Sequence, residues 1–555
     1  MIERISKSFF KLKPWKHQYE AVNAAAPHEG FGFFFEVGAG KTAPAITMAR
    51  YQCVRHGRQL KVLILANPPV LLPKWKKEYM AWSNTNPHAI QVLNGTTKER
   101  IKLMEQIGDA PGVIITNYES LTLGGARDKK RKTVYHPGEL FNLLLAWQPD
   151  VLILDESQNC KSHSALRTTQ AIKLREKAMY CYLLSGSPIL NKSLDIFTQY
   201  LLIDKGKTFG TSFFAFRGRY FKDKNAGMSK QKYFPKWEPK EGAVAELNQM
   251  VQRKSMYVQK KDCLDLPPLV ESTIEVGMSK KQAKAYQEMQ RDYLTFIEEN
   301  REALENNPSL LMDCDYDDMI LRFDENDVMP FDFDEVGEKP PGEPAAAPQR
   351  SNKSVAIAEL AVTKAMRLMQ IVSGFVNVEE GDGKRRAVQF EDAPIIQALE
   401  DLLKLHCENS KVIVWAVHHA NYGVIRNVCD KLKLPYVEVH GGISTQKKKD
   451  EAVRRFNDDH DCRVFIGHPG SGGVGIDLIA SDVSITFSRS FSLAHKIQSA
   501  GRNYRGGSEI HKKVTQYEIV TQKTIDEQVI KSLASKQEIG YQVLKKFTAD
   551  WQLDY

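Results

Sequence analysis

Two groups of residues in this chain have the types and the spacing that phosphate chemistry requires, and they lie far apart in the sequence. The first is a glycine-rich segment that ends in a lysine and a hydroxyl residue, namely Gly38, Ala39, Gly40, Lys41 and Thr42. Glycines let backbone N–H groups turn toward a phosphate, the lysine is a cation for the β- and γ-oxygens of a nucleotide, and the threonine hydroxyl reaches Mg²⁺. We therefore expect ATP and Mg²⁺ as cofactors. A chance glycine turn ahead of a helix is the alternative for this segment taken alone.

The second group lies near the C-terminus, in residues 498–505, and supplies Arg502 and Arg505. Arginine keeps its charge and makes bidentate contacts to phosphate, and an arginine that reaches a nucleotide from another lobe is worth roughly 10³–10⁵ in rate. If the two arginines sit on a helix, this spacing places them on one face. The alternative is a basic, solvated surface helix, but it does not explain why a glutamine, a glycine and both arginines occur together after residues 472–477. The two groups together predict two lobes that close on one nucleotide.

A pair of carboxylates and a pair of serines complete the candidate chemistry. The apolar run 151–154 ends in Asp155 and Glu156. Asp155 at a strand tip can hold Mg²⁺ through its water shell, and Glu156 can polarise the attacking water. An ordinary acidic strand end is the alternative, and the upstream phosphate loop argues against it. A later apolar run is followed by Ser185 and Ser187, whose hydroxyls can relay the state of the nucleotide through hydrogen bonds.

Short apolar runs, each followed by a mixed helical stretch, would position these groups. Such runs are typical of parallel strands buried on both faces, and the repeat of strand, loop and helix predicts an α/β sheet. The N-terminal runs are residues 31–35, 62–66, 113–116, 151–154 and 182–184. The C-terminal runs are residues 411–417, 436–440, 464–467, 483–488 and 515–520. The sequence therefore predicts two α/β lobes, with the phosphate loop in the first and the arginines in the second.

The segment between the two lobes differs in composition. Residues 213–222 are aromatic and basic, so they either stack on bases or pack as a helix onto the first lobe. Residues 301–350 hold 14 acidic and 4 basic side chains and end in a proline-rich run, which predicts a disordered or loop insert. We place a first lobe at 1–205, a helical insertion at 206–300, the acidic insert and linker at 301–350, a second lobe with a leading helix at 351–540, and a tail at 541–555.

Charge and cysteine content narrow the class of protein. The whole chain carries +9, and because residues 301–350 carry −10, the rest carries +19. A body that basic suits a partner with a phosphate backbone, although general solubility explains the charge as well. The 8 cysteines never form a Cys-x-x-Cys pair, which argues against a zinc site. No apolar stretch approaches the ~20 residues that cross a bilayer and no signal peptide is evident, so we expect a cytoplasmic protein without a membrane partner.

Taken in order along the chain, these motifs resemble those of the superfamily-two helicases, and in particular the Swi/Snf-type DNA translocases with their compact bacterial and phage-encoded members. The similarity covers about residues 10–270 and 360–540. The matching segments are 14–18, 35–42, 63–75, 115–119, 155–158, 185–188, 411–415, 439–442, 472–478, 498–505 and 524–527.

The resemblance implies two tandem RecA-like parallel-sheet lobes with a helical insertion and the acidic insert. The catalytic residues would be Lys41, Glu156, Arg502 and Arg505, and the metal would be held by Thr42 and Asp155. The nucleotide would be bound by Gln18, at the adenine, and by Gly38, Ala39, Gly40, Lys41, Thr42, Gly475 and Asp477. The nucleic acid would be contacted by Pro68, Asn117, Ser185, His440, Gly441, Gly472 and Gly473.

Some positions depart from the family pattern. Gln158 stands where a histidine is usual, Ser185 and Ser187 stand where threonines are usual, and Tyr504 stands where a histidine is usual. These changes leave the hydrolysis residues intact and bear on the coupling between ATP and DNA.

The expected activity is DNA-stimulated ATP hydrolysis that drives movement on duplex or branched DNA, gripped through phosphates rather than base edges. A strand-separating helicase, a non-catalytic DNA-binding scaffold and the motor subunit of a larger complex are the alternatives, and RNA is left open as the track. A metabolic P-loop enzyme would not explain the second lobe. The acidic insert 301–350 is a candidate contact for a protein partner or a DNA mimic, and a plain solvated loop ranks above the latter. The expected location is a bacterial host cytoplasm.

Overall fold

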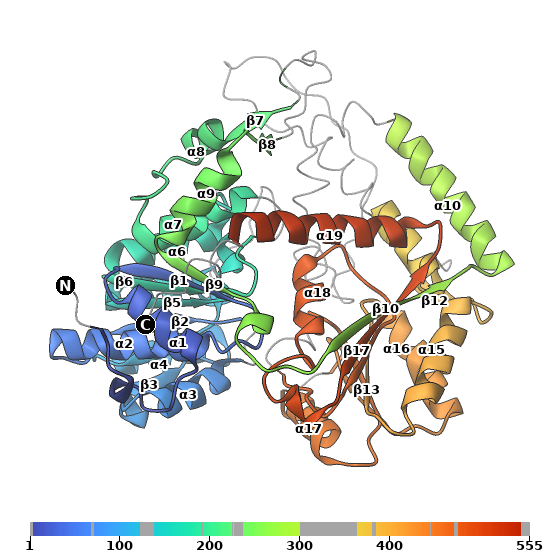
Figure 1. Cartoon of the computed structure of the whole chain (residues 1–555), viewed down its shortest axis with the longest axis horizontal. Coiled ribbons are helices and arrows are strands. Elements are labelled where there is room, and N and C mark those ends of the chain that lie inside the picture. The colour runs from blue at the N-terminus through green and yellow to red at the C-terminus, as the bar shows by residue number, and fades with distance from the viewer. Residues whose placement is uncertain are drawn as a thin grey trace.

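The computed structural model describes residues 4–67, 71–122, 138–189, 193–224, 226, 237–299, 363–379, 385–443, 446–470 and 476–544. The acidic insert 301–350 lies outside these residues, as do the candidate contacts Pro68, Gly472, Gly473 and Gly475. Two parallel sheets, each surrounded by helices, form two lobes that lie side by side (Figure 1). This arrangement confirms the predicted fold class of two tandem RecA-like lobes.

The first lobe is built on a seven-stranded parallel sheet with the order β3-β4-β2-β5-β6-β1-β9. Its strands are β1 (Gly30–Phe35), β2 (Val62–Leu65), β3 (Ile90–Val92), β4 (Val113–Thr116), β5 (Val151–Asp155), β6 (Tyr180–Leu184) and β9 (Ser255–Val258). Its α-helices are α1 (Lys16–Ala25), α2 (Thr42–His56), α3 (Leu71–Trp82), α4 (Thr97–Ile107), α5 (Glu139–Trp147), α6 (Leu166–Lys177) and α7 (Ile196–Asp204). All N-terminal runs predicted as strands are strands of this sheet.

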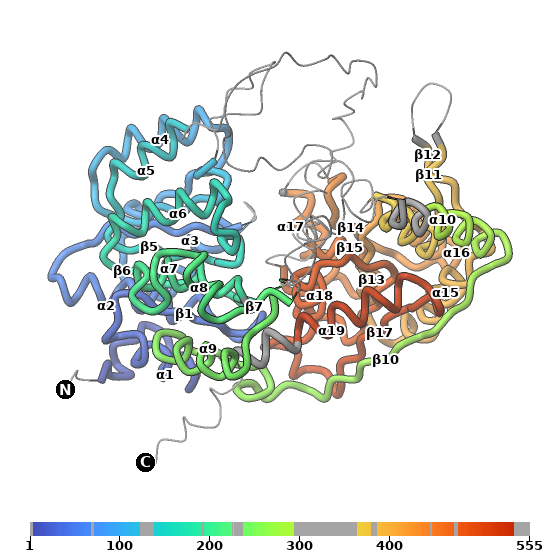
Figure 2. Tube along the Cα trace, turned by 90° about the horizontal axis from the view of Figure 1, so that it is seen from above, coloured from blue at the N-terminus to red at the C-terminus, as the bar shows by residue number. Residues whose placement is uncertain are grey.

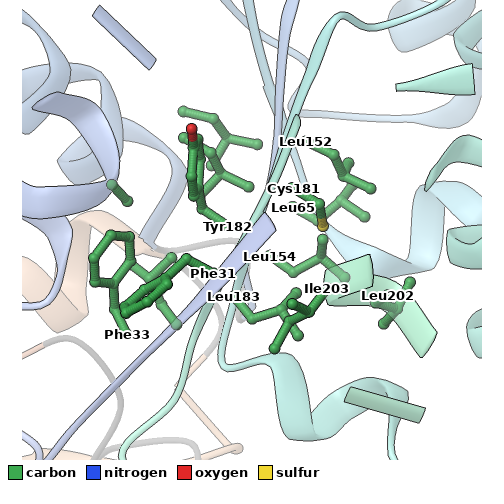
Figure 3. Packing of buried hydrophobic residues seen from close by; sticks show 14 of the residues in the cluster. Phe31, Phe33, Leu65, Leu152, Leu154, Cys181, Tyr182, Leu183, Leu202 and Ile203 are labelled. Carbon is green, nitrogen blue, oxygen red and sulfur yellow. The ribbon is translucent and has the colours of Figure 1, made fainter. Parts of the chain in front are cut away.

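Strand β1 shows why the sheet needs helices on both faces. Phe31 and Phe33 lie on the same side as Tyr182 of β6, whose hydroxyl accepts a hydrogen bond from Gln52 of α2 at 3.0 Å (Figure 3). The opposite side of β1 lies against α7. A Cβ at Gly30 would stand 1.9 Å from the carbonyl oxygen of Ile203, so only a glycine allows this close approach.

The second lobe is built on a six-stranded parallel sheet with the order β10-β17-β16-β13-β15-β14. Its strands are β10 (Leu269–Val276), β13 (Val412–Trp415), β14 (Tyr436–Val439), β15 (Val464–Gly467), β16 (Val483–Thr486) and β17 (Val514–Thr521). Its α-helices are α15 (Pro394–His406), α16 (His419–Lys431), α17 (Gln446–Asp458), α18 (Leu493–Ala500) and α19 (Ile525–Leu544). A hairpin of β11 (Phe375–Glu379) and β12 (Arg385–Gln389) extends from this lobe (Figure 2).

The helical insertion packs onto the first lobe. It contains α8 (Phe213–Tyr220), the short hairpin of β7 (Phe221–Asp223) and β8 (Trp237–Pro239), and α9 (Ala243–Gln252). Phe216 and Tyr220 of α8 are buried, and the Phe216 ring lies 5.2 Å from that of Phe197 in α7. The aromatic segment therefore forms a packed helix, although Phe214 on the same helix is exposed.

The chain crosses from the first sheet to the second earlier than the predicted boundaries suggest. Strand β9 pairs with β1 of the first sheet, whereas β10 pairs along its whole length with β17 of the second. Both strands fall within residues 206–300, the range predicted as a helical insertion. Residues 259–268, with the 3-10 turn η6 (Lys260–Asp262), are therefore the link between the lobes.

Two long helices frame the second lobe. Helix α10 (Lys280–Glu299) packs on α19, because the backbone N–H of Ile525 donates to the Tyr286 hydroxyl at 2.8 Å. Helix α19 runs from the second lobe across to α9 of the insertion (Figure 1). None of the described helices is both long enough and apolar enough to cross a membrane.

We predict that Phe33→Ala lowers the free energy of unfolding of the first lobe by about 3–5 kcal/mol, because it removes a fully buried ring from the core. Urea denaturation followed by circular dichroism measures this change. Phe214→Ala is the matched control, since that ring is 66% exposed and its loss should cost about 0.5 kcal/mol or less. Equal effects of the two substitutions would contradict the assignment of Phe33 to the core.

Candidate active site between the two lobes

The glycine-rich loop connects β1 to α2 and is enclosed from both sides. Gly38 and Gly40 have φ angles of +95° and +73°, a region that glycine enters without strain. A Cβ at Gly38 would lie 2.7 Å from the Cβ of Arg505 in the second lobe, and one at Gly40 would lie 2.5 Å from Nε2 of Gln18. The loop therefore touches the second lobe on one side and the start of α1 on the other.

The two predicted cofactor-binding residues that end this loop, Lys41 and Thr42, lie at the start of α2. Lys41 is the N-cap of the helix and Thr42 is its first residue, so the backbone N–H groups of the first turn are directed at the loop. Lys41 Nζ donates to Glu156 Oε1 at 3.0 Å, and both side chains are largely buried. The predicted phosphate-binding lysine and the predicted water-activating carboxylate are thus brought together.

The two predicted carboxylates have different surroundings. Asp155 ends β5, where Oδ2 accepts from Trp75 Nε1 at 2.8 Å and Oδ1 accepts from the backbone N–H of Glu156 at 3.0 Å. Burial, together with the neighbouring charge of Glu156, raises the pKa of Asp155. Burial also opposes ionisation of Glu156, but Lys41 and the hydrogen bond from Gln158 outweigh it and lower its pKa. Glu156 has a φ of +50°, an uncommon conformation that turns its side chain toward the loop.

Gln158 links this carboxylate to the serines that follow β6. Its Nε2 donates to Glu156 Oε2 at 2.6 Å, and its Oε1 accepts from Ser185 Oγ at 2.6 Å. Ser185 Oγ in turn accepts from the backbone N–H of Ser187 at 3.0 Å. Three of the four residues expected to depart from the family pattern, Gln158, Ser185 and Ser187, therefore form a continuous hydrogen-bond path to Glu156, because an amide carries both a donor and an acceptor.

Gln18, the predicted adenine contact, is bonded to the loop in this structure. Its Nε2 donates to the Gly40 carbonyl at 2.9 Å, and its Oε1 accepts from the backbone N–H of Trp15 at 2.8 Å. His17 Nε2 lies 2.8 Å from the Ala39 carbonyl oxygen. The start of α1 is thus tied to the loop through successive carbonyl groups.

The second lobe directs three charged residues at the same place. Arg505 forms an ion pair with Asp477, and Lys74 of the first lobe also pairs with Asp477 at 3.3 Å. Arg502 is buried, its Nη1 donates to the Ile476 carbonyl at 3.2 Å, and its Nε has no hydrogen-bond partner among the described residues. Burial and the nearby Arg505 lower the pKa of Arg502 to about 10. A buried guanidinium with an unused donor is suited to an anionic ligand.

The two arginines do not sit on a helix, so the condition for a shared helix face is not met. Helix α18 ends at Ala500, and Arg502 and Arg505 lie in the turns that follow it. The chain leaves the helix at Gly501, where a Cβ would stand 2.9 Å from Cγ1 of Val37. Close packing on the glycine-rich loop, rather than helical periodicity, sets where the arginines point.

Lys260 of the link contacts both lobes beside the glycine-rich loop. Its backbone N–H donates to Glu36 Oε2 at 3.0 Å, and its Nζ donates to the Tyr504 carbonyl at 2.8 Å. The Nζ atom also lies 4.8 Å from the centre of the Tyr504 ring, within the range of a cation–π contact. Burial lowers the pKa of Lys260 to about 8, with Glu36 opposing and the two site arginines adding to the shift.

The described residues predicted to contact nucleic acid differ in their exposure to solvent. The side chains of Asn117, Ser185 and His440 are buried. Asn117 Oδ1 accepts from Arg100 Nη1 at 2.8 Å, and His440 Nε2 lies 3.1 Å from Glu438 Oε2. Gly441 is exposed. Of the candidates that the structure describes, the glycine is therefore the one whose backbone is open to a large partner.

Sequence reasoning missed several residues of the site. Trp75, Lys74, Lys260 and Glu36 all contact the predicted residues. The first two and Glu36 fall inside the matching segments 63–75 and 35–42 but were given no role, and Lys260 lies outside the matching segments. Lys260 bonds to a residue 244 positions away and Trp75 to one 80 positions away, so no local pattern could reveal these contacts. Within the described part of the chain no group of three or more His, Cys, Asp or Glu side chains could hold a metal ion, and the metal-holding roles of Asp155 and Thr42 stay predictions.

The comparisons with known proteins agree with this geometry. A family model described as the SNF2-related domain matches residues 25–318, and one described as the helicase conserved C-terminal domain matches residues 395–507. The class defined by the fold and site is thus a two-lobed helicase-type protein with a phosphate loop in one lobe and arginines in the other. The chain belongs to the SNF2-related family.

Individual relatives are distant. An uncharacterized ATP-dependent helicase of Mycoplasma genitalium is 24% identical, covering 94% of this chain and 41% of the relative. A RAD54-like DNA repair and recombination protein of Drosophila willistoni is 21% identical, over 93% and 61%. A putative protein p41 of Acyrthosiphon pisum secondary endosymbiont phage 1 is 21% identical, over 95% and 96%. The chain thus spans less than two thirds of the first two relatives.

One solved structure is also similar, at 18% identity and a TM-score of 0.38 over 97% of this chain and 94% of that chain. It is the SWI2/SNF2 ATPase core of Sulfolobus solfataricus in complex with dsDNA. The family assignment does not depend on it.

The pKa of Lys260 predicts how the stability of the closed arrangement changes with pH. Its folded pKa of about 8 lies below that of an exposed lysine, about 10.4. The unfolded chain therefore binds more protons between these values, and the contribution of Lys260 to stability rises with pH in that window and falls as pH drops through it. Tm of the wild type minus Tm of Lys260→Met should increase from about pH 7.5 to about pH 9.5.

Lys261→Met is the matched control for this measurement, because Lys261 is the exposed neighbour on the same turn. Its difference in Tm from the wild type should stay constant with pH. A Lys260→Met difference that is also constant would contradict the buried position of the ammonium group.

Proposed function

We propose that this chain hydrolyses ATP between its two lobes and that DNA stimulates the hydrolysis and is the track along which the lobes move. The convergence of both lobes on one loop carries the proposal. Gly38 lies against Arg505, and Lys41 pairs with Glu156. A loop with a helix N-terminus, a lysine and two arginines from the other lobe is a donor set suited to a polyphosphate.

The residues present fit ATP and Mg²⁺. The positive φ angles of Gly38 and Gly40 and the unused Nε of buried Arg502 favour an anionic ligand at the loop. When bound, ATP·Mg²⁺ would supply the phosphoanhydride bond that is cleaved. Lys41 and the arginines would bind its phosphate oxygens, while Thr42 and Asp155 would hold the metal. Gln18, already bonded to Gly40, would contact the adenine, and Asp477 would lie beside the nucleotide.

Glu156 is the group proposed to orient the attacking water. Its lowered pKa keeps it ionised near neutrality, so it can accept a hydrogen bond from water or a proton. Its two oxygens are held by Lys41 and Gln158 at 3.0 and 2.6 Å. Gln158 would therefore hold one carboxylate oxygen even when Lys41 turns to the phosphates, and it links that carboxylate to Ser185.

DNA is the proposed track because the chain is basic and because its relatives include proteins named for DNA repair. The chain outside residues 301–350 carries +19, which favours a phosphate backbone. Helix α17, close after Gly441, exposes Lys447, Lys448, Arg454 and Arg455. The RAD54-like relatives are named as DNA repair and recombination proteins. We include the segments of Pro68, Asn117, His440 and Gly472–Gly473 in the contact surface, through backbone atoms where the side chains are buried.

ATP hydrolysis measured without nucleic acid and then with single-stranded DNA, duplex DNA, a branched junction and RNA tests the proposal. Strong stimulation by duplex or branched DNA is expected, and stimulation should weaken with salt because phosphate contacts dominate. Stimulation by RNA but not by DNA would mean that RNA, rather than DNA, is the track. No hydrolysis under any condition would contradict the proposed ATPase activity and favour a scaffold.

Lys41→Ala and Arg502→Ala should each reduce ATP turnover by roughly 10³-fold or more while duplex DNA binding survives. The first substitution removes the phosphate-binding cation of the loop, and the second removes a cation supplied by the other lobe. Steady-state hydrolysis together with DNA binding by fluorescence anisotropy measures both effects. Lys173→Ala, an exposed lysine of α6, is the control and should leave turnover unchanged. Retained turnover in Lys41→Ala would overturn the site assignment.

Gln158→Ala should reduce the ratio of DNA-stimulated to basal hydrolysis by roughly tenfold, because it breaks the path from Ser185 to Glu156 at both hydrogen bonds. Gln158→His keeps one donor and one acceptor nitrogen and should retain part of the stimulation. The two ratios are compared at saturating duplex DNA. A ratio in Gln158→Ala equal to that of the wild type would show that the path carries no coupling.

A further inference from the structure

Asp155 is held by two aromatic side chains that come from outside its own strand. Trp75 Nε1 donates to Asp155 Oδ2 at 2.8 Å, and the Tyr118 hydroxyl donates to the Asp155 carbonyl oxygen at 2.8 Å. The other carboxylate oxygen accepts from the backbone N–H of Glu156 at 3.0 Å. The side chain and the backbone of this one residue are therefore both fixed by named donors.

Both donors are buried, and each faces an oxygen that can only accept. Trp75 and Tyr118 are 3% and 0% exposed. An indole N–H can only donate, and burial raises the pKa of Tyr118 well above its usual value, so its hydroxyl keeps its proton. The bond from Trp75 to a carboxylate is charge-assisted and hence stronger than a neutral one. Trp75 thus orients the carboxylate of Asp155, and Tyr118 holds the backbone that carries it.

The elements that carry these donors follow the predicted DNA-contacting segments. Trp75 lies on α3, which starts after the segment of Pro68, and Tyr118 is the first residue of the 3-10 turn η3 (Tyr118–Leu121), directly after Asn117. Both elements follow strands next to each other in the sheet order β4-β2-β5, and β5 ends in Asp155. A movement of α3 or η3 therefore reaches Asp155 through one hydrogen bond.

We propose that Trp75 is a positioning residue for the metal-holding carboxylate, and that with Tyr118 it passes DNA contact at α3 and η3 on to Asp155. This inference rests on the proposed function, because it assigns a coupling role within the same site. Ordinary core packing is the competing explanation, since a buried tryptophan N–H usually finds some acceptor. If Trp75 only packs in the core, its substitution should lower the stability of the protein. If Trp75 positions Asp155, its substitution should lower the Mg²⁺-dependent part of the nucleotide affinity.

The affinity for a fluorescent ADP analogue, measured with Mg²⁺ and with EDTA, separates these explanations. Trp75→Phe keeps the buried ring and removes the donor, so it should reduce the Mg²⁺-dependent gain in ADP affinity by roughly tenfold while affinity in EDTA stays unchanged. Trp82→Phe, the same substitution at the end of the same helix, should leave both affinities unchanged. Tyr118→Phe should show the same metal-specific loss to a smaller extent.

Adding duplex DNA to the same titrations tests the coupling. Duplex DNA should change the Mg²⁺-dependent gain in the wild type and in Trp82→Phe, and should leave it unchanged in Trp75→Phe. A wild-type protein that binds no ADP would reject the proposed function itself. A wild type with a Mg²⁺-dependent gain that Trp75→Phe retains in full would reject the positioning role, and a DNA effect that survives in Trp75→Phe would reject the coupling.

Discussion

The structure depends on the way charged side chains from two lobes are paired around one loop. Lys41 pairs with Glu156 inside the first lobe and Arg505 pairs with Asp477 inside the second, while Lys74 of the first lobe reaches the same Asp477. A buried charge is costly unless a partner and hydrogen bonds satisfy it, and Lys41 and Glu156 satisfy each other. The Lys74–Asp477 pair and the bond from Lys260 to Tyr504 join the two lobes beside these charges, and the cations of the site are the donors that a polyphosphate needs. The cations that join the lobes and those that would bind phosphate therefore lie in the same site.

The fold supplies that arrangement because parallel strands place their carboxyl ends at one edge of a sheet. The loop after β1, the carboxylates after β5 and the serines after β6 come from strands that are neighbours or near neighbours in the order β5-β6-β1. The second lobe reaches this edge through the turns after α18. Two elements connect the lobes (Figure 1). The link bonds to the second lobe beside the site through Lys260, and helix α19 of the second lobe contacts α9 of the insertion farther away.

Much of the fold and of the nucleotide site could be predicted from the sequence, because apolar runs and a phosphate loop are local patterns. The predicted strand runs all became strands, and the structure brings Lys41 to Glu156 and Arg505 to Gly38. Strand β10 was missed because it is an edge strand with alternating exposure, which leaves no continuous apolar run. The arginines lie in turns rather than on a helix, because α18 ends at Ala500 and the following Gly501 packs on Val37. The donors to Asp155 and the contacts of Lys260 depend on long-range packing, which spacing along the chain cannot encode.

The central claim is that Lys41 and Arg505 exchange carboxylates for phosphate when ATP binds between the lobes. A crystal structure with Mg²⁺ and a non-hydrolysable ATP analogue tests it most directly. The account predicts that Lys41 Nζ and the Arg505 guanidinium lie within hydrogen-bond distance of phosphate oxygens, with the Lys41–Glu156 and Arg505–Asp477 pairs opened. A nucleotide bound elsewhere, or both ion pairs intact beside the bound analogue, would contradict it.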